Sequence, residues 1–104
     1  MRQSQNEVLH LIDEQIERLK NSAEAEAVEL RRTQQAAAEA RLAYRASPTD
    51  LTERPMWKMS MTADMQLENV RSADEAVKIG LAAREFIITA FGEEEREKGR
   101  DRIA

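Results

Sequence analysis

Apolar side chains recur every three or four residues along the first part of the chain, which is the spacing of one helix face. Ser4 and Glu7 have the S-x-x-E spacing of a capping box, which places the helix start near them. Glu26 and Thr33 lie where a strict heptad would carry apolar residues, so a long free-standing coiled coil is not expected. The pattern predicts a first helix over residues 5–45. Its apolar face consists of Leu9, Ile12, Ile16, Leu19, Ala23, Ala27 and Leu30.

The strongest break in the chain is the segment Ser-Pro-Thr-Asp at residues 47–50. Proline disfavours helical conformation at the residue before it, and Pro55 interrupts the helical pattern a second time. We therefore expect a connector over residues 46–54. A connector of this length is typical of an antiparallel hairpin of two helices.

A second helix is predicted over residues 55–91, followed by a charged tail over residues 92–104. Gly92 is placed like a residue that ends a helix. Ser72 and Glu75 repeat the S-x-x-E spacing, so a kink or a second helix start near Ser72 is an alternative to one straight helix. The chain is thus predicted to be a single all-α domain, an antiparallel helical hairpin.

The predicted second helix carries apolar residues on two sides, although a helix in a simple hairpin needs only one apolar side. At about 100° per residue the two groups lie on opposite sides of the helix. The first stripe consists of Met56, Met59, Ala63, Leu67, Val70, Val77, Leu81 and Ile88. The second stripe consists of Trp57, Met61, Met65, Ile79, Ala83, Phe86 and Ala90. Because one neighbouring helix covers only one stripe, the pattern predicts that the protein binds another protein chain.

The densest apolar segment predicts a further contact near the end of the second helix. Phe86, Ile87 and Ile88 are consecutive and span about 200° of the helix circumference, more than one neighbouring helix can cover. Leu11 stands apart from the apolar face of the first helix, and antiparallel pairing brings it near this segment. The residues expected to contact a partner or a second copy are Leu11, Trp57, Met61, Met65, Ile79, Phe86 and Ile87.

All internal methionines lie within ten residues, beside the only tryptophan, Trp57. Methionine adapts its shape to irregular surfaces, and tryptophan is enriched at binding hot spots. The cluster is open to two interpretations, a binding surface or a plug at the end of the hairpin beside the connector. Met56 and Met59 belong to the first stripe, whereas Met61 and Met65 belong to the second.

Composition narrows the class of protein. Hydrophobic residues make up 41% of the 104 residues, but 16 of them are alanine, so a monomer would have a thin core and a four-helix homodimer is expected. The net charge of −4 argues against general nucleic-acid binding. The chain has no cysteine, no signal-peptide pattern and no apolar run of about 18 residues that could span a membrane. We expect a cytoplasmic protein.

The sequence offers little catalytic chemistry. His10 is the only histidine, and with Glu7 it has the Glu-x-x-His spacing of di-metal helix bundles. Glu7 is already explained by the capping box and the motif lies in the first helical turn, so no metal site is expected there. Without a cysteine nucleophile or a glycine-rich phosphate loop, we expect neither an enzyme nor a cofactor.

Arginines make the region around the predicted turn locally basic. They either form a docking patch for an acidic partner or phosphate, or belong to a solvated face balanced by nearby glutamates. The second interpretation is favoured because mixed charge on an amphipathic helix is usually solvated. The residues concerned are Arg31, Arg32, Arg41, Arg45 and Arg54.

In size, acidity, hairpin layout and doubly apolar second helix, the chain resembles the small bacterial quorum-sensing anti-activators of the QslA type. The resemblance covers the whole chain but no diagnostic motif. It implies a regulator that binds a LuxR-type transcription factor and blocks its dimerisation and DNA binding. The alternative is a structural homodimer that scaffolds a phage or secretion assembly, in which self-association would cover both stripes.

Overall fold

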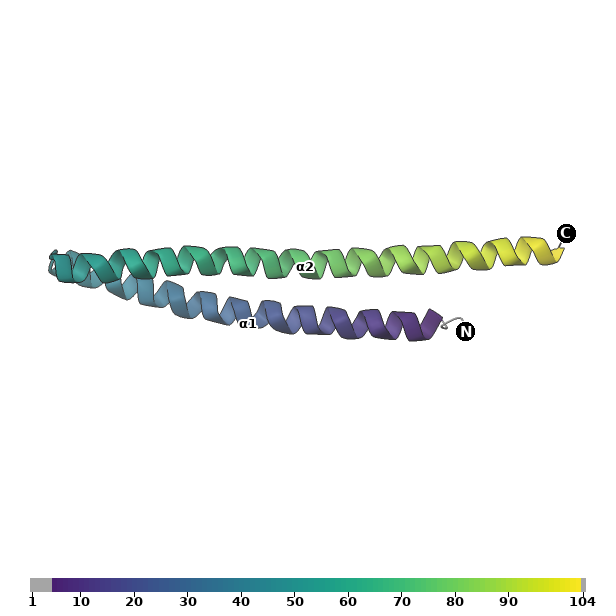
Figure 1. The fold of residues 1–104 in the computed structure, drawn as a ribbon, viewed down its shortest axis with the longest axis horizontal. Helices are drawn as coiled ribbons and strands as arrows, with labels where there is room; N and C mark the ends of the chain where they lie inside the picture. Colours follow the sequence, from purple (N-terminus) through teal and green to yellow (C-terminus); the bar gives the residue numbers. More distant parts are fainter. Residues whose placement is uncertain (1–4, 104) are drawn as a thin grey trace.

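Two long helices form an antiparallel hairpin, as the sequence predicts. The computed structural model describes the backbone of residues 5–103 and all side chains of residues 5–95. Helix α1 (Gln5–Ala46) packs along helix α2 (Asp50–Ile103), and the two termini lie at the same end of the molecule (Figure 1). The all-α hairpin fold is therefore confirmed, whereas its pairing into a homodimer stays a prediction.

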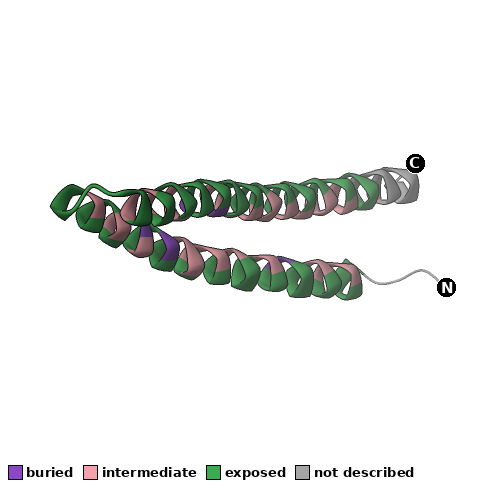
Figure 2. Cartoon of the chain, turned by 60° about the vertical axis from the view of Figure 1, so that its left-hand side comes forward, coloured by how far each residue is buried: buried purple, intermediate pink, exposed green. Residues whose placement is uncertain are grey.

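The hairpin is at most two helices thick, and α2, with 54 residues against 42 in α1, extends beyond the start of α1 (Figure 1). It measures 83 × 19 × 16 Å and has a radius of gyration of 23.6 Å, against about 13 Å for a compact domain of this size. Exposed residues cover most of both helices (Figure 2). Among the described side chains the buried ones are Ile16, Thr33, Ala37, Ala63 and Gln66. The core is therefore as thin as the composition indicated.

The connector comprises only residues 47–49, so the predicted connector over 46–54 is too long. Thr49 and Thr52 cap α2 reciprocally: the Thr49 N–H donates to Thr52 Oγ1 at 3.0 Å, and the Thr52 N–H donates to Thr49 Oγ1 at 3.3 Å. The Thr52 hydroxyl also donates to the Ser47 carbonyl at 2.6 Å. This is a capping box with threonine in place of the usual glutamate or glutamine, and it lets α2 begin directly after Thr49.

Helix α2 extends beyond the predicted range 55–91 at both ends. Pro55 lies in its second turn, where the fixed φ of proline suits a helix and the missing N–H leaves only the Leu51 carbonyl without a donor. Gly92 does not end the helix, because no glycine along residues 5–103 has the positive φ of a C-terminal glycine cap. The predicted helix ends at Pro55 and Gly92 are therefore wrong, because α2 is continuous through both residues.

The segment that was expected to be a charged tail continues α2 as far as Ile103, while residue 104 lies outside the described residues. Its charges alternate in sign over three or four residues, a spacing that stabilises an exposed helix. Helix α2 is also continuous through Ser72, and it is drawn without a sharp bend (Figure 1). The alternative of a second helix start at Ser72 is therefore wrong.

A polar contact lies in the middle of the interface between the helices. Gln66 Nε2 donates to the backbone carbonyl of Glu26 at 2.9 Å and to its carboxylate at 2.5 Å, and Asn69 Nδ2 donates to Gln66 Oε1 at 3.1 Å. The buried Thr33 hydroxyl donates to the Leu30 carbonyl at 3.0 Å. The two residues that interrupt the heptad pattern of α1 therefore have hydrogen-bond partners and permit close packing.

The helices approach each other closely at Gly80. A Cβ at this position would lie 3.3 Å from Ile16 Cγ1 and 3.4 Å from Leu19 Cδ1, whereas a Cβ at Gly92 would meet no described atom within 4 Å. The absence of a side chain at Gly80 therefore lets α2 lie against two apolar side chains of α1.

Replacing each of the two glycines by alanine is expected to change the free energy of unfolding by different amounts. Gly92→Ala is expected to raise the free energy of unfolding by about 0.5–1 kcal/mol, because alanine favours the helix more than glycine does. Gly80→Ala is expected to give a smaller gain, since the new methyl group crowds Ile16 and Leu19. Urea unfolding followed by circular dichroism measures both variants. Equal gains at the two positions would contradict close helix packing at Gly80.

Candidate protein-binding surface

The second stripe of α2 is uncovered in the hairpin. Its large side chains are between 59% and 73% exposed, namely Trp57, Met61, Met65, Ile79 and Phe86. The first stripe, by contrast, is buried or half-buried against α1 except at Leu81. Helix α1 thus covers one of the two predicted stripes and leaves the other to solvent. Large exposed apolar side chains in a row are typical of a protein–protein contact surface.

The second stripe divides into two blocks with a polar stretch between them. The N-terminal block consists of Trp57, Met61 and Met65. The C-terminal block consists of Ile79, Ala83, Phe86 and Ala90, all of them exposed. Glu68, Ser72 and Glu75 continue the same side of the helix between the blocks and are exposed as well. The surface therefore offers two apolar contact regions, joined by a polar centre.

The Met cluster divides between the two sides of α2. Met56 and Met59 are half-buried, whereas Met61 and Met65 are exposed. Trp57 is also exposed, and its Nε1 donates to Glu53 Oε1 on the same helix at 3.4 Å. The cluster thus contributes both to hairpin packing beside the connector and to the exposed surface, so each of the two interpretations accounts for part of it.

Trp57 provides a built-in reporter for this surface, because it is the only tryptophan. We expect its fluorescence emission to shift to shorter wavelength as protein concentration rises, since an indole leaves water when the second stripe is covered. Met61→Asp should reduce the shift. Leu42→Asp, which changes an exposed apolar residue of α1, is the matched control and should leave the shift unchanged. Emission that is independent of concentration would contradict self-association through this surface.

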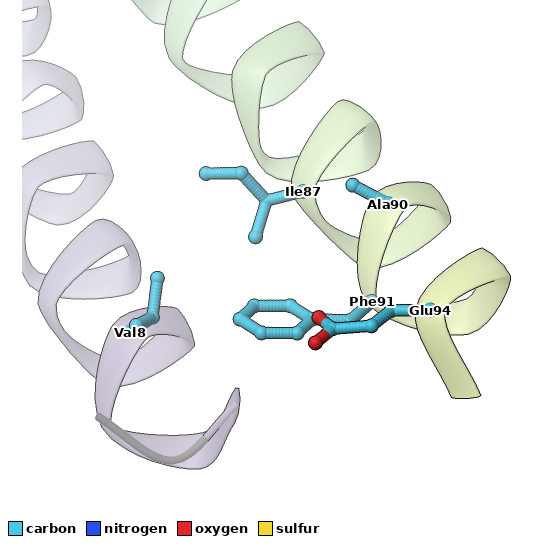
Figure 3. Close-up of a pocket in the computed structure, with 5 residues that line it drawn as sticks. All are labelled: Val8, Ile87, Ala90, Phe91 and Glu94. Carbon is cyan, nitrogen blue, oxygen red and sulfur yellow. The ribbon is translucent and has the colours of Figure 1, made fainter. Parts of the chain in front are cut away.

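Ile87 lies differently from the other predicted contact residues. It is half-buried and, with Phe91, extends toward Val8 of α1, lining a pocket of about 230 Å³ together with Ala90 and Glu94 (Figure 3). Within one hairpin Ile87 therefore lies between the helices, and its contact with a partner or a second copy stays a prediction. A heptad contact drifts by about 20° per seven residues relative to a straight helix, so the buried side moves towards Ile87 by this point. The same drift accounts for the exposure of Leu81.

Leu11 is exposed, as expected for a contact residue, and lies at the level of the C-terminal block. Arg84 Nε donates to Asp13 Oδ1 at 2.7 Å between the helices, which fixes this level. The hydrogen bond from Arg84, with the negative charge of Asp13, raises the pKa of the guanidinium above its ordinary value. Because the helices are antiparallel, Leu11 on α1 and Phe86 on α2 each lie two residues farther from the turn than the Asp13–Arg84 pair.

Three further apolar side chains are exposed that the sequence pattern did not single out, Val28, Leu42 and Leu51. Val28 and Leu42 lie off the apolar face of α1, and Leu51 fell within the predicted connector. For Val28 and Leu42, a position off the apolar face of α1 was the sequence signal that predicts exposure. They are spread along the hairpin at wide sequence separation, so none of them extends the second stripe.

The residues considered for chemistry lie on the solvent side. His10 Nε2 is 3.0 Å from Glu14 Oε1, and within the described part of the chain no group of three histidine or carboxylate side chains is placed to hold a metal ion. The arginines near the connector are exposed, and Arg32 is paired with Glu29, whose pKa is lowered by the hydrogen bond from Arg32. These contacts agree with the interpretation of a solvated face.

Comparison with known proteins gives no family for this chain: no family model, no curated protein and no solved structure matches it. Neither helix has, within its described residues, a stretch long and apolar enough to cross a membrane. The resemblance to the anti-activators therefore rests on the hairpin layout and on the two apolar sides of α2.

Proposed function

We propose that the protein is a non-enzymatic regulator that binds a partner protein through the second stripe of α2. The single observation that supports this proposal is the row of large side chains on this stripe, all more than half exposed. A row of apolar residues at helical spacing matches the way an amphipathic helix lies in an apolar groove or against another helix. Tryptophan and methionine within it suit a contact that must adapt to a partner.

The partner proposed is a bacterial transcription factor, in particular a LuxR-type receptor, held in a state that cannot dimerise. The resemblance in size, acidity and hairpin layout to the QslA-type anti-activators suggests this choice. Occupying an apolar dimerisation surface removes the receptor from its active dimer by mass action and needs no chemistry. Loss of the dimer then abolishes DNA binding, because paired half-sites require two subunits. The net charge of −4 keeps the regulator itself off DNA.

A second candidate function is a structural homodimer that scaffolds a phage or secretion assembly. The observation that favours it is the shape, a rod of 83 Å that is only 19 Å across. A rod built from paired hairpins covers a long distance with few residues, and its sides offer long surfaces for contact with neighbouring subunits. In this case self-association covers the second stripe, and no transcription factor binds it.

The two candidates are distinguished by capture followed by a functional assay. The tagged protein, Trp57→Ala and Phe86→Asp serve as baits in bacterial lysate, with Leu42→Asp as the matched surface control, and mass spectrometry identifies the captured chains. We expect a LuxR-type regulator with the native bait and the control only. Adding the purified protein should then abolish the mobility shift of that regulator on its DNA.

Three results would overturn the proposed regulator. One is recovery of the bait alone, and a second is capture of structural assembly components. The third is a captured regulator whose DNA shift persists at saturating concentrations of the protein. The first two favour the scaffold, and the third shows that binding does not block dimerisation.

A further inference from the structure

We infer that the second stripe of α2 is the contact surface of an antiparallel homodimer, with the two-fold axis close to Ser72. This inference concerns the purified protein alone and does not depend on the proposed partner. It assigns the second stripe to self-association, a choice that the apolar pattern by itself leaves open.

The arrangement of the stripe is nearly symmetric about its centre. Residue 72 lies halfway between Met65 and Ile79, the inner ends of the two blocks, and within one residue of halfway between Trp57 and Phe86. An antiparallel two-fold at Ser72 therefore places the N-terminal block of each copy over the C-terminal block of the other. The polar centre of one copy meets the polar centre of the other, which places Glu68 of each copy beside Glu75 of the other.

Charges beside the stripe distinguish antiparallel from parallel pairing. Asp64, Arg71 and Lys78 are exposed and seven residues apart, so they form one row along the same edge of the stripe. In an antiparallel pair this edge meets its own copy, which places Asp64 opposite Lys78 of the second copy, twice per dimer. Arg71 lies next to the axis, where Glu68 of its own helix holds it at 2.7 Å.

In a parallel pair the row would meet the opposite edge of the second copy. That edge carries no charge over the same length, since it consists of Met65, Asn69, Ala76 and Ala83. Asp64 and Lys78 would then lack partners. Glutamates of the polar centre meet in both arrangements, Glu68 with Glu75 of the second copy in the antiparallel pair and each with its own copy in the parallel pair, so they do not distinguish the two. The Asp64–Lys78 pairs form only in the antiparallel arrangement and therefore favour it.

The accessible surface is large enough for such an interface. The chain exposes 8381 Å², whereas a compact monomer of 11.9 kDa exposes about 6,000 Å². The surplus of about 2,400 Å² exceeds the roughly 800 Å² per partner of a standard stable interface. The stripe itself runs from Trp57 to Ala90, about 50 Å along the helix. A contact of this length and composition suits a second copy of the same elongated helix.

The test uses single cysteines, because the native chain contains none. Ser72→Cys is expected to give a covalent dimer with a short bis-maleimide crosslinker, since both copies meet at this residue. Met61→Cys alone is expected to give no covalent dimer, because the two cysteines lie about 33 Å apart in the antiparallel dimer. An equimolar mixture of Met61→Cys and Ala83→Cys should crosslink between the two different chains. All three variants change exposed positions.

Sedimentation equilibrium of the native chain accompanies the crosslinking and is expected to give the mass of two chains. Crosslinking of Met61→Cys with itself would overturn the antiparallel arrangement in favour of a parallel one. A single-chain mass without crosslinking at Ser72→Cys would overturn the homodimer. Both readouts use only this protein, so a negative result here leaves the capture experiment above as a separate test of the proposed regulator.

Discussion

Phe86→Asp is expected to turn the protein into a monomer of nearly unchanged helix content. Phe86 is the most exposed large side chain of the second stripe, so the hairpin does not need it for packing. In the antiparallel dimer, two such side chains leave water, each worth about 1.5–3 kcal/mol. Their replacement by two carboxylates should weaken association by about 100-fold or more. Sedimentation and far-ultraviolet circular dichroism measure the two effects separately.

Two neighbouring substitutions serve as controls for Phe86→Asp. Thr89→Asp adds the same charge at an exposed position that is outside both stripes and should leave association nearly unchanged. Ile88→Asp places the charge in the half-buried first stripe and should reduce stability and helix content. If Phe86→Asp unfolds the chain as Ile88→Asp does, Phe86 belongs to the core and the division of α2 into two sides is wrong.

Gln66→Glu is expected to lower the free energy of unfolding by about 2–4 kcal/mol at neutral pH. Gln66 is buried, and its amide donates to both the backbone carbonyl and the carboxylate of Glu26. The variant removes both donors and places a second carboxylate against the first in a partly buried site, where like charges repel strongly. The loss should shrink as the pH is lowered, because a proton on the introduced carboxyl group removes the repulsion and restores a donor.

Two further variants separate charge from hydrogen bonding at this site. Gln66→Met removes the donors without adding charge, so its smaller loss of stability should not depend on pH in this way. Combined Glu26→Leu and Gln66→Leu should equal or exceed native stability, because an apolar pair suits these heptad positions and the exposed Asn69 amide, which loses Gln66 Oε1 as acceptor, bonds to water instead. Urea unfolding over a range of pH measures all three. A Gln66→Glu variant as stable as the native chain would show that the contact with Glu26 is not maintained in solution.

The proposed homodimer and the proposed complex with a partner both use the second stripe of α2. A second copy that covers the stripe would have to leave before another protein could bind there. The protein concentration, relative to the dissociation constant of the proposed dimer, would therefore limit how much of the protein is free to bind a partner. Phe86→Asp removes both interactions, whereas Asp64→Lys should weaken only the self-complementary charge row.

Much of the fold follows from local properties of the sequence. The period of about 3.6 residues identifies both helices, and the capping and proline signals locate the turn between them. The ends of α2 were predicted less well, because Thr52 in place of glutamate hid the cap, and because Pro55 and Gly92 are compatible with a helix in this context. Whether proline or glycine ends a helix depends on the φ angle of the residue and on its position in the helix. Neither can be inferred from the residue type alone.

That α2 has two apolar sides follows from its sequence, since this depends on the angle between successive residues. Which side α1 covers, and which residues pair across the interface, became known from the packing of the two helices. Gln66 meets Glu26, and Ile87 turns towards Val8 while Phe86 stays exposed. These facts depend on helix register and on the gradual drift of the contact around α2, which accumulate over many residues and have no local signature.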